Sequence, residues 1–141
     1  MKATFFVAAT TVLIAAPATA EPTGDAAAGE KAFRQCQSCH VVQNAAGDVL
    51  AGRAGKTGPN LFGVAGATAG QVEGFRYSDG LVAAGEGGMV YDEATFVAYV
   101  QDPTGKIREA TGDDKARGKM TYRVRKEEDA VNLYAFIAGL E

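Results

Sequence analysis

The sequence contains only one histidine and two cysteines, and this shortage of His and Cys ligands restricts the metal sites that it can form. A structural zinc site normally uses four Cys or His ligands. Only Cys36, Cys39 and His40 are present, and they lie too close in sequence to surround one ion. A zinc domain is therefore excluded, and a single disulfide between the two cysteines is the simplest structural alternative.

The sequence also lacks an excess of basic charge, a late hydrophobic run and an extended alternating pattern. Lys and Arg number 14 against 17 Asp and Glu, so a uniformly basic nucleic-acid-binding protein is excluded. No apolar stretch after residue 20 is long enough to span a bilayer. Alternation of apolar and polar residues never continues long enough to predict a β-sheet.

Residues 1–20, MKATFFVAATTVLIAAPATA, have the pattern of a secretory signal peptide. Lys2 supplies the early positive charge, an apolar run covers residues 5–16, and the small residues Ala18 and Ala20 provide a cleavage site before Glu21. A retained membrane anchor is the alternative, but the run is shorter than the roughly 18–20 residues that span a bilayer. We therefore expect a periplasmic protein in which residues 21–141 form a single domain.

Residue periodicity and helix-end signals predict three helices. The first covers residues 25–37, the second covers 92–101 and the third covers 127–138. The second should stop before Asp102 and Pro103, and the third has acidic residues at its N-terminal end, where they are stabilising. These helices are short and the chain is rich in glycine, so we expect a small core that a large apolar cofactor would complete.

Both cysteines and the histidine occur within the stretch RQCQSCHVV, residues 34–42. The Cys-x-x-Cys-His spacing is the attachment signal for a c-type haem, in which two cysteines bond to the porphyrin and the adjacent imidazole binds the iron. A thioredoxin-like redox pair would follow a strand, whereas the residues before Cys36 have helical periodicity. The pattern therefore favours one covalently attached haem c on Cys36 and Cys39, with His40 as an iron ligand.

The second axial position of such a haem has several candidate ligands. Without a second histidine, the candidates are Met89, Met120, a lysine amine or no protein ligand at all. Met89 precedes a helix start and suits a core position. Met120 lies in the polar stretch RGKMTYRV, where an apolar side chain has little reason to occur unless it binds something. Met120 is favoured, and a thioether ligand would raise the reduction potential of the iron.

Six motifs are similar, in the same order, to those of the class I c-type cytochromes, and within that class to the soluble bacterial cytochrome c2 branch. They are GDAAAGEKAFRQCQSCH, KTGPNLFGVAG, EGFRYSDG, YDEATFVAYVQDP, GKMTYRV and EDAVNLYAFIAGL. Together they cover most of residues 21–141, so this resemblance is much more specific than the haem motif alone. It implies an all-α cytochrome c fold, in which helices and long loops surround one covalent haem.

The resemblance assigns roles to individual residues. It implies that His40 and Met120 are the axial ligands and that the carbonyl of Pro59 accepts a hydrogen bond from His40. It also implies that Tyr77 contacts a haem propionate and that Tyr99 lies near the Met120 sulfur.

Further implications concern helix contacts and departures from the family pattern. Gly29 and Phe33 of the first helix are expected to contact Leu133 and Phe136 of the last. Segments 43–54 and 104–118 are longer than in mitochondrial relatives and are expected as surface loops. Three residues differ from those usual in the family, which weakens the expected propionate contacts: Ala67, Tyr91 and Gly118.

By this resemblance the chain is an electron-transfer protein and not an enzyme. It would carry single electrons from a cytochrome bc complex to a terminal oxidase or a photosynthetic reaction centre, as a monomer that docks only briefly. Five basic and no acidic residues occur between positions 117 and 126. Positive charge near the haem edge would steer the carrier onto acidic membrane partners. The residues expected on this basic face are Arg34, Lys56, Lys106, Lys119 and Arg123.

Two other classes of protein remain as alternatives. A haem enzyme or sensor, such as a small peroxidase or a gas-binding module, would need an iron whose distal position is open. A thiol oxidoreductase would use the two cysteines without any haem.

Overall fold

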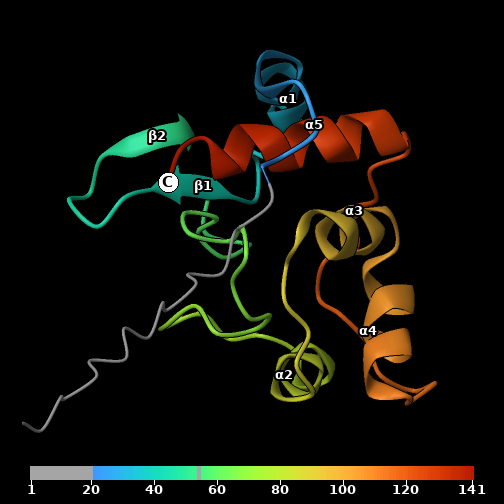
Figure 1. Cartoon of the computed structure of the whole chain (residues 1–141). Coiled ribbons are helices and arrows are strands. Elements are labelled where there is room, and N and C mark those ends of the chain that lie inside the picture. Colours follow the sequence, from blue (N-terminus) through green and yellow to red (C-terminus); the bar gives the residue numbers. More distant parts are fainter. Residues whose placement is uncertain (1–20, 54) are drawn as a thin grey trace, which may run out of the picture.

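The computed structural model describes residues 21–53 and 55–141, so the predicted signal peptide lies outside the described residues. In this part of the chain, five helices and one short hairpin are joined by long loops (Figure 1). In chain order they are α1 (Ala26–Phe33), β1 (Val41–Gln43), β2 (Val49–Gly52), α2 (Asp79–Glu86), α3 (Glu93–Gln101), α4 (Pro103–Thr111) and α5 (Glu127–Ala138). Within the same residues, no helix is both long and apolar enough to cross a membrane.

Helix α1 leads directly into the Cys-x-x-Cys-His motif. It begins after Asp25, whose carboxylate accepts hydrogen bonds from N–H groups of the first turn. It ends at Phe33, so the prediction of a helix over 25–37 is too long. Residues 34–39 form consecutive turns instead, in which the N–H of Cys36 donates to the Phe33 carbonyl (2.8 Å) and the N–H of His40 to the Cys36 carbonyl (2.9 Å). These turns bring both cysteines and the histidine to one end of α1.

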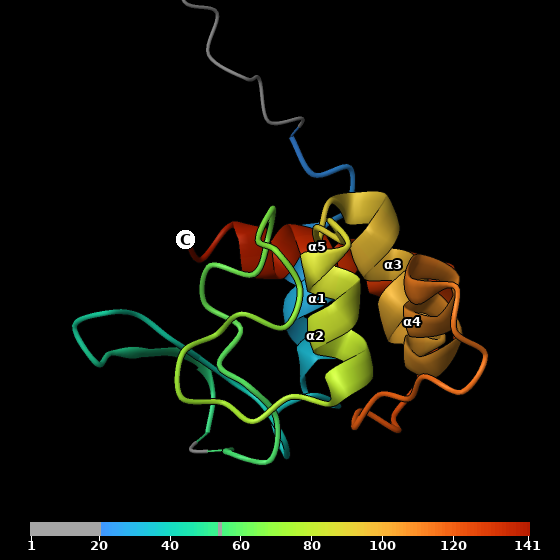
Figure 2. The same cartoon turned by 90° about the horizontal axis from the view of Figure 1, so that it is seen from below.

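Helices α1 and α5 cross in close contact (Figures 1 and 2). Gly29 lies at the crossing, where an added Cβ would overlap the backbone carbonyl of Asn132. Next to it, the rings of Phe33 and Phe136 pack with their centroids 5.6 Å apart. The side chain of Asn132 accepts a hydrogen bond from the N–H of Asp25 at 2.8 Å. The predicted contact of Gly29 and Phe33 with the last helix is thus confirmed.

Helices α3 and α5 occur where the sequence predicts them. Asp92 precedes α3 and accepts a hydrogen bond from the N–H of Thr95 at 2.7 Å, which is the usual arrangement at a helix start. Helix α5 covers 127–138, as predicted, with three acidic residues in its first turn. Local signals were sufficient here because both helices have clear start residues and apolar positions at helical spacing.

Helices α2 and α4 are absent from the sequence-based prediction. Residues 104–118 were expected as a loop, but α4 occupies the first half of that segment. Asp102 both ends α3 and caps α4, and Pro103 occupies the first helical position, which proline favours. Gly112 ends α4 with a positive φ of 68°. The pair Asp102–Pro103, which marks the end of α3, therefore also marks the start of α4.

Residues 43–54 were expected as a surface loop, but most of a short hairpin, which no sequence pattern indicated, lies within this segment. Strands β1 and β2 pair in antiparallel register, with Val41 opposite Gly52 and Val42 opposite Ala51. This hairpin projects from the body of the molecule (Figure 2). Val42 is fully buried, whereas Val49 is more than half exposed. The strands are only 3 and 4 residues long, too short to give an alternating pattern in the sequence.

The α1–α5 crossing provides a test of the fold. We predict that Gly29→Ala lowers the free energy of unfolding by about 1–3 kcal/mol, because overlap with the α5 backbone outweighs the better helix propensity of alanine. Urea unfolding followed by circular dichroism measures this. Gly139→Ala is the matched control, since a Cβ there would meet its nearest neighbour at 3.4 Å, an ordinary contact. Equal stability of the two variants would contradict the prediction.

Candidate functional site

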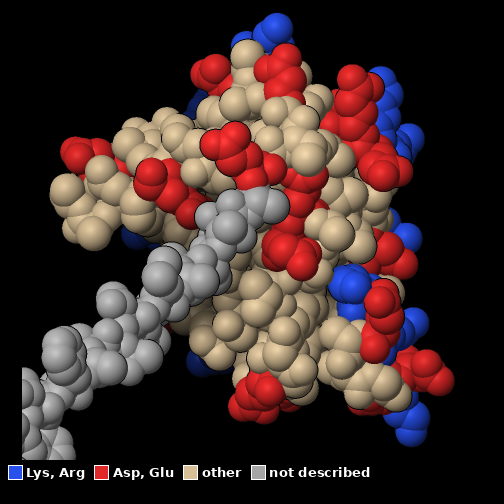
Figure 3. Space-filling model, in the orientation of Figure 1, with Lys and Arg blue, Asp and Glu red and all other residues tan. Residues whose placement is uncertain are grey.

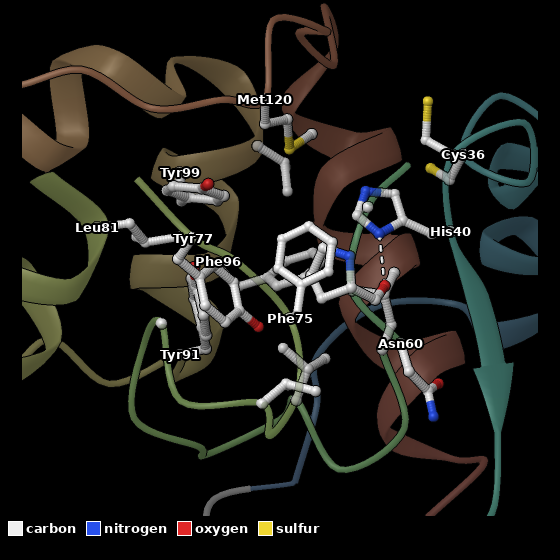
Figure 4. Close-up of a pocket in the computed structure, with 18 of the residues that line it drawn as sticks. Cys36, His40, Asn60, Phe75, Tyr77, Leu81, Tyr91, Phe96, Tyr99 and Met120 are labelled. Carbon is white, nitrogen blue, oxygen red and sulfur yellow. Dashed lines mark hydrogen bonds between the residues drawn. The ribbon is translucent and has the colours of Figure 1, made fainter. Parts of the chain in front are cut away.

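A cavity of about 240 Å³ lies between the turns after α1, the loops around residues 57–78 and the segment before α5 (Figure 4). Protein interiors normally contain few voids larger than a water molecule, so a cavity of this size indicates a binding site. Its walls are mainly aliphatic and aromatic. They include Leu61, Val64, Phe75, Leu81, Phe96 and Leu133.

The side chains predicted to bind the haem all face this cavity. Cys36, Cys39 and His40 enter from the turns after α1, and Met120 enters from the segment between α4 and α5 (Figure 4). Met89 is only 7% exposed, belongs to the apolar core and is not part of the cavity wall. The fold therefore brings one imidazole, one thioether and two thiols together from opposite ends of the chain.

His40 is oriented by backbone groups. Its Nδ1 donates a hydrogen bond to the carbonyl of Pro59 at 2.9 Å (Figure 4). Burial lowers the pKa of His40, and the hydrogen bond to Pro59 opposes this shift with a smaller effect. The imidazole is therefore neutral at pH 7, with its proton on Nδ1 and the lone pair of Nε2 available to a metal. Gly58 lies against the ring, and a Cβ at this position would overlap it.

Asn60 holds the loop that carries Pro59, a role that sequence reasoning missed. Its amide nitrogen donates to the carbonyl of Gln43 (2.7 Å), and its Oδ1 accepts from the N–H groups of Gln43 (2.9 Å) and Phe62 (3.1 Å). The loop is thereby tied to strand β1, which follows His40 directly. Asn60 lies within the motif KTGPNL, but its partner is 17 residues away, so no local pattern indicated the contact.

Cys36 does not have the properties of a redox-active thiol. Both cysteines are free in the structure. Burial raises the pKa of the Cys36 thiol to about 11, and the nearby Cys39 adds to this shift. Cysteines that act as nucleophiles in oxidoreductases have lowered pKa values, because the thiolate is the reactive form. This environment disfavours the thiol oxidoreductase alternative.

Three tyrosines gather on the side of the cavity away from His40 (Figure 4). The ring of Tyr77 packs edge-on against Phe75, with centroids 4.8 Å apart, and Tyr91 packs against Tyr99 at 5.4 Å. Burial raises the pKa of all three hydroxyls, and that of Tyr99 to about 12. They therefore stay protonated at neutral pH and can donate hydrogen bonds. Ala67, which also lines the cavity, has no polar side chain to add.

Basic side chains lie at the edge of the cavity and beyond it. Lys119 lines the rim, and its Nζ donates to the carbonyl of Arg76 at 2.6 Å. Arg123 forms an exposed ion pair with Asp102 at 2.9 Å. Lys106 was expected in a loop, but it lies within α4 and pairs with Glu109 at 3.0 Å. On the face shown in Figure 3, most of the charged side chains are acidic, and Lys and Arg side chains lie mostly along its right-hand edge.

Comparison with known proteins decides the family, although no family model matches the chain. Cytochrome c2 from Rhodovulum adriaticum is 62% identical over 118 residues, which cover 84% of this chain and 94% of the relative. Cytochrome c2 from Cereibacter sphaeroides is 51% identical over 132 residues, which cover 93% of this chain and 90% of the relative. The chain belongs to the cytochrome c2 family.

Solved structures of cytochromes c2 agree with this assignment. The X-ray structure of cytochrome c2 from Rhodobacter sphaeroides superposes with a TM-score of 0.81 at 52% identity, covering 82% of this chain and 95% of that one. Cytochrome c2 from Paracoccus denitrificans gives a TM-score of 0.78 at 38% identity, covering 83% and 96%. The cytochrome c fold is thus confirmed, and the chain is an electron carrier of the cytochrome c class with one covalently attached haem c.

The cavity of this cytochrome c2 fits a haem c. The walls are apolar, two thiols lie at Cys-x-x-Cys spacing, and an imidazole and a thioether face the same space. The missing Cβ of Gly58 leaves room for the His40 ring. No group of three or more His, Cys, Asp or Glu side chains in residues 21–53 and 55–141 could hold a metal ion by itself. These residues therefore suit an iron porphyrin better than a bare metal ion.

The role of Asn60 is open to a direct test. We predict that Asn60→Ala destabilises the protein by about 1–3 kcal/mol and speeds exchange of the His40 Nδ1 proton, because the Pro59 loop loses two of its hydrogen bonds to β1. Hydrogen exchange of that proton is measured by NMR in the ferrous protein. Asn44→Ala is the control: Asn44 also makes several hydrogen bonds, but in the hairpin turn. If both variants exchange this proton equally fast, the proposed role of Asn60 is wrong.

Proposed function

We propose that this cytochrome c2 is a periplasmic one-electron carrier with His40 and Met120 as the axial ligands of a haem attached through Cys36 and Cys39. The supporting observation is that these four side chains, from the two ends of the chain, face one apolar cavity. The bound haem supplies the redox-active iron. The chain supplies the attachment, both ligands and a largely apolar surrounding.

Each ligand contributes a distinct property. His40 offers the lone pair of Nε2, and Pro59 keeps the ring in place and in one tautomer through Nδ1. Met120 offers a soft thioether sulfur, which favours the ferrous state and raises the reduction potential. With both axial positions held by side chains, no position remains for a substrate. This arrangement favours a carrier over a small peroxidase or a gas-binding module.

The surrounding side chains exclude water and leave few places for polar contacts. Tyr77 and Tyr99 face the cavity with hydroxyls that stay protonated, and we propose that Tyr77 donates to a propionate and that Tyr99 lies beside the Met120 sulfur. A largely apolar surrounding has few polar groups that would have to reorient when the iron gained or lost an electron. Such a site therefore suits rapid electron exchange.

The partners we propose are a cytochrome bc complex as donor and a terminal oxidase or photosynthetic reaction centre as acceptor. Arg34, Lys56, Lys119 and Arg123 are exposed, and Lys119 is at the cavity rim. Positive charge at this place on an acidic protein orients the approach to an acidic partner and raises the association rate. The signal-peptide pattern of residues 1–20 supports a periplasmic location, where such partners are accessible.

Axial ligation by methionine is the first test of this function. We predict that Met120→Ala removes the weak red-edge absorption band of methionine-ligated ferric haem and lowers the reduction potential by on the order of 0.1 V or more. Absorption spectroscopy and redox titration measure both. Met89→Leu, a change of similar volume in the core, should keep the band and the potential. A band that survives Met120→Ala would show that another group is the ligand.

Electrostatic docking is the second test. We predict that Lys56→Glu slows electron transfer to an isolated bc complex or oxidase by roughly tenfold at low ionic strength, and that the difference shrinks as salt is added. Stopped-flow kinetics over a range of salt concentrations measures the effect. Lys31→Glu, which makes the same charge change on α1 away from the cavity wall, is the control. Equal slowing by both variants would show that net charge, and not the basic face, controls the rate.

A further inference from the structure

The segment that carries Met120 is held in an unusual way. Among the described residues, no hydrogen bond between backbone groups joins residues 117–123 to the rest of the protein. The nearest such bonds lie outside the segment, where the N–H of Ala116 donates to the Asp113 carbonyl (3.0 Å) and the N–H of Val124 to the Val100 carbonyl (2.8 Å). Segments with few backbone hydrogen bonds open at low cost in free energy. Residues 117–123 must therefore be held by other contacts.

Met120 itself packs against the apolar core. Three other side chains of the segment make polar contacts, and each reaches a different part of the fold. Lys119 donates from Nζ to the carbonyl of Arg76 at 2.6 Å, in the loop before α2. Tyr122 donates from its hydroxyl to Oε1 of Gln35, in the turns between α1 and Cys36. The third contact is the ion pair between Arg123 and Asp102, at the junction of α3 and α4.

Two of these contacts are close to Met120 and to the cavity. Lys119 precedes Met120 directly and Tyr122 follows two positions later, and both line the cavity together with Met120. Their partners are 43 and 87 residues away in sequence, so both contacts join the segment to distant parts of the wall. The ion pair of Arg123 is further along the segment and has both side chains more than half exposed, so its contribution is small.

We propose that Lys119 and Tyr122 are positioning residues that hold the Met120 sulfur at the iron and set how often that position opens to ligands from solvent. This inference rests on the proposed ligation by Met120. When a site is open only a small fraction of the time, the apparent affinity for an external ligand is reduced by that fraction. Loss of either contact raises the open fraction, and the apparent affinity rises by the same factor.

Imidazole binding to the ferric holoprotein tests this inference. We expect Tyr122→Phe and Lys119→Gln each to lower the dissociation constant for imidazole by about three- to tenfold, since one hydrogen bond of ordinary net strength changes an equilibrium by about that factor. Lys119→Arg keeps a long cationic donor and should stay close to wild type. The dissociation constant is measured from the change in the haem absorption spectrum.

Arg125→Gln is the matched control for charge. It removes one positive charge from the same basic run, at a side chain that makes no hydrogen bond or ion pair with the described residues. The control should bind imidazole as wild type does. Urea midpoints, measured on all variants, separate local opening from general destabilisation, because a local effect raises imidazole affinity without a matching fall in the midpoint.

The outcomes distinguish this inference from the proposed function. Tighter imidazole binding in Tyr122→Phe and Lys119→Gln, with the red-edge band retained and Arg125→Gln unchanged, supports it. Unchanged affinity in both variants, or an equal change in Arg125→Gln, overturns it while ligation by Met120 stands. A wild-type protein without the red-edge band would overturn the ligation itself, and the inference with it.

Discussion

The crossing of α1 over α5 at Gly29 is the contact on which the haem site depends. Helix α1 runs directly into the turns that hold Cys36 and His40, and α5 follows directly after the segment that holds Met120. The contact between the two helices therefore sets where the Cys36–His40 turns lie relative to the Met120 segment. Because an added Cβ at Gly29 would overlap the α5 backbone, the helices pack closer here than larger residues would permit.

The His40 side and the Met120 side of the cavity are held by different kinds of contact. On the histidine side, backbone hydrogen bonds act together with the Asn60 side chain: the N–H of Gly58 donates to the Cys39 carbonyl at 2.8 Å, and the N–H of Leu61 to the Val41 carbonyl at 2.9 Å. On the methionine side, side-chain hydrogen bonds and an ion pair join residues 117–123 to the rest of the protein. An iron–sulfur bond would itself add a tie to that segment. The proposed ligation would thus be coupled to local folding on the methionine side, whereas the hydrogen bond to Pro59 holds His40 without it.

The residues that meet at the cavity could be predicted from the sequence because the pattern depends on residue types at fixed spacing. Cys36, Cys39 and His40 are adjacent, and Met120 could be preferred because its loop is polar. Helices α3 and α5 have local start signals. The contacts of Asn60, the pairing of β1 with β2 and the early end of α1 could not be predicted. They depend on partners distant in sequence or on turn geometry, and neither leaves a periodic pattern.

Two of the five residues expected on the basic face form ion pairs in the structure. Lys106 and Arg123 each lie beside a carboxylate, so each pair acts at a distance as a weak dipole and not as a positive charge. Lys119 is different, since a backbone carbonyl accepts its hydrogen bond without cancelling its charge. Of the five residues expected on the basic face, Arg34, Lys56 and Lys119 would therefore contribute most to the proposed attraction of an acidic partner. Lys119 alone among these three combines a net charge with a contact that holds the Met120 segment, so the proposed docking and the proposed ligation would meet at one side chain.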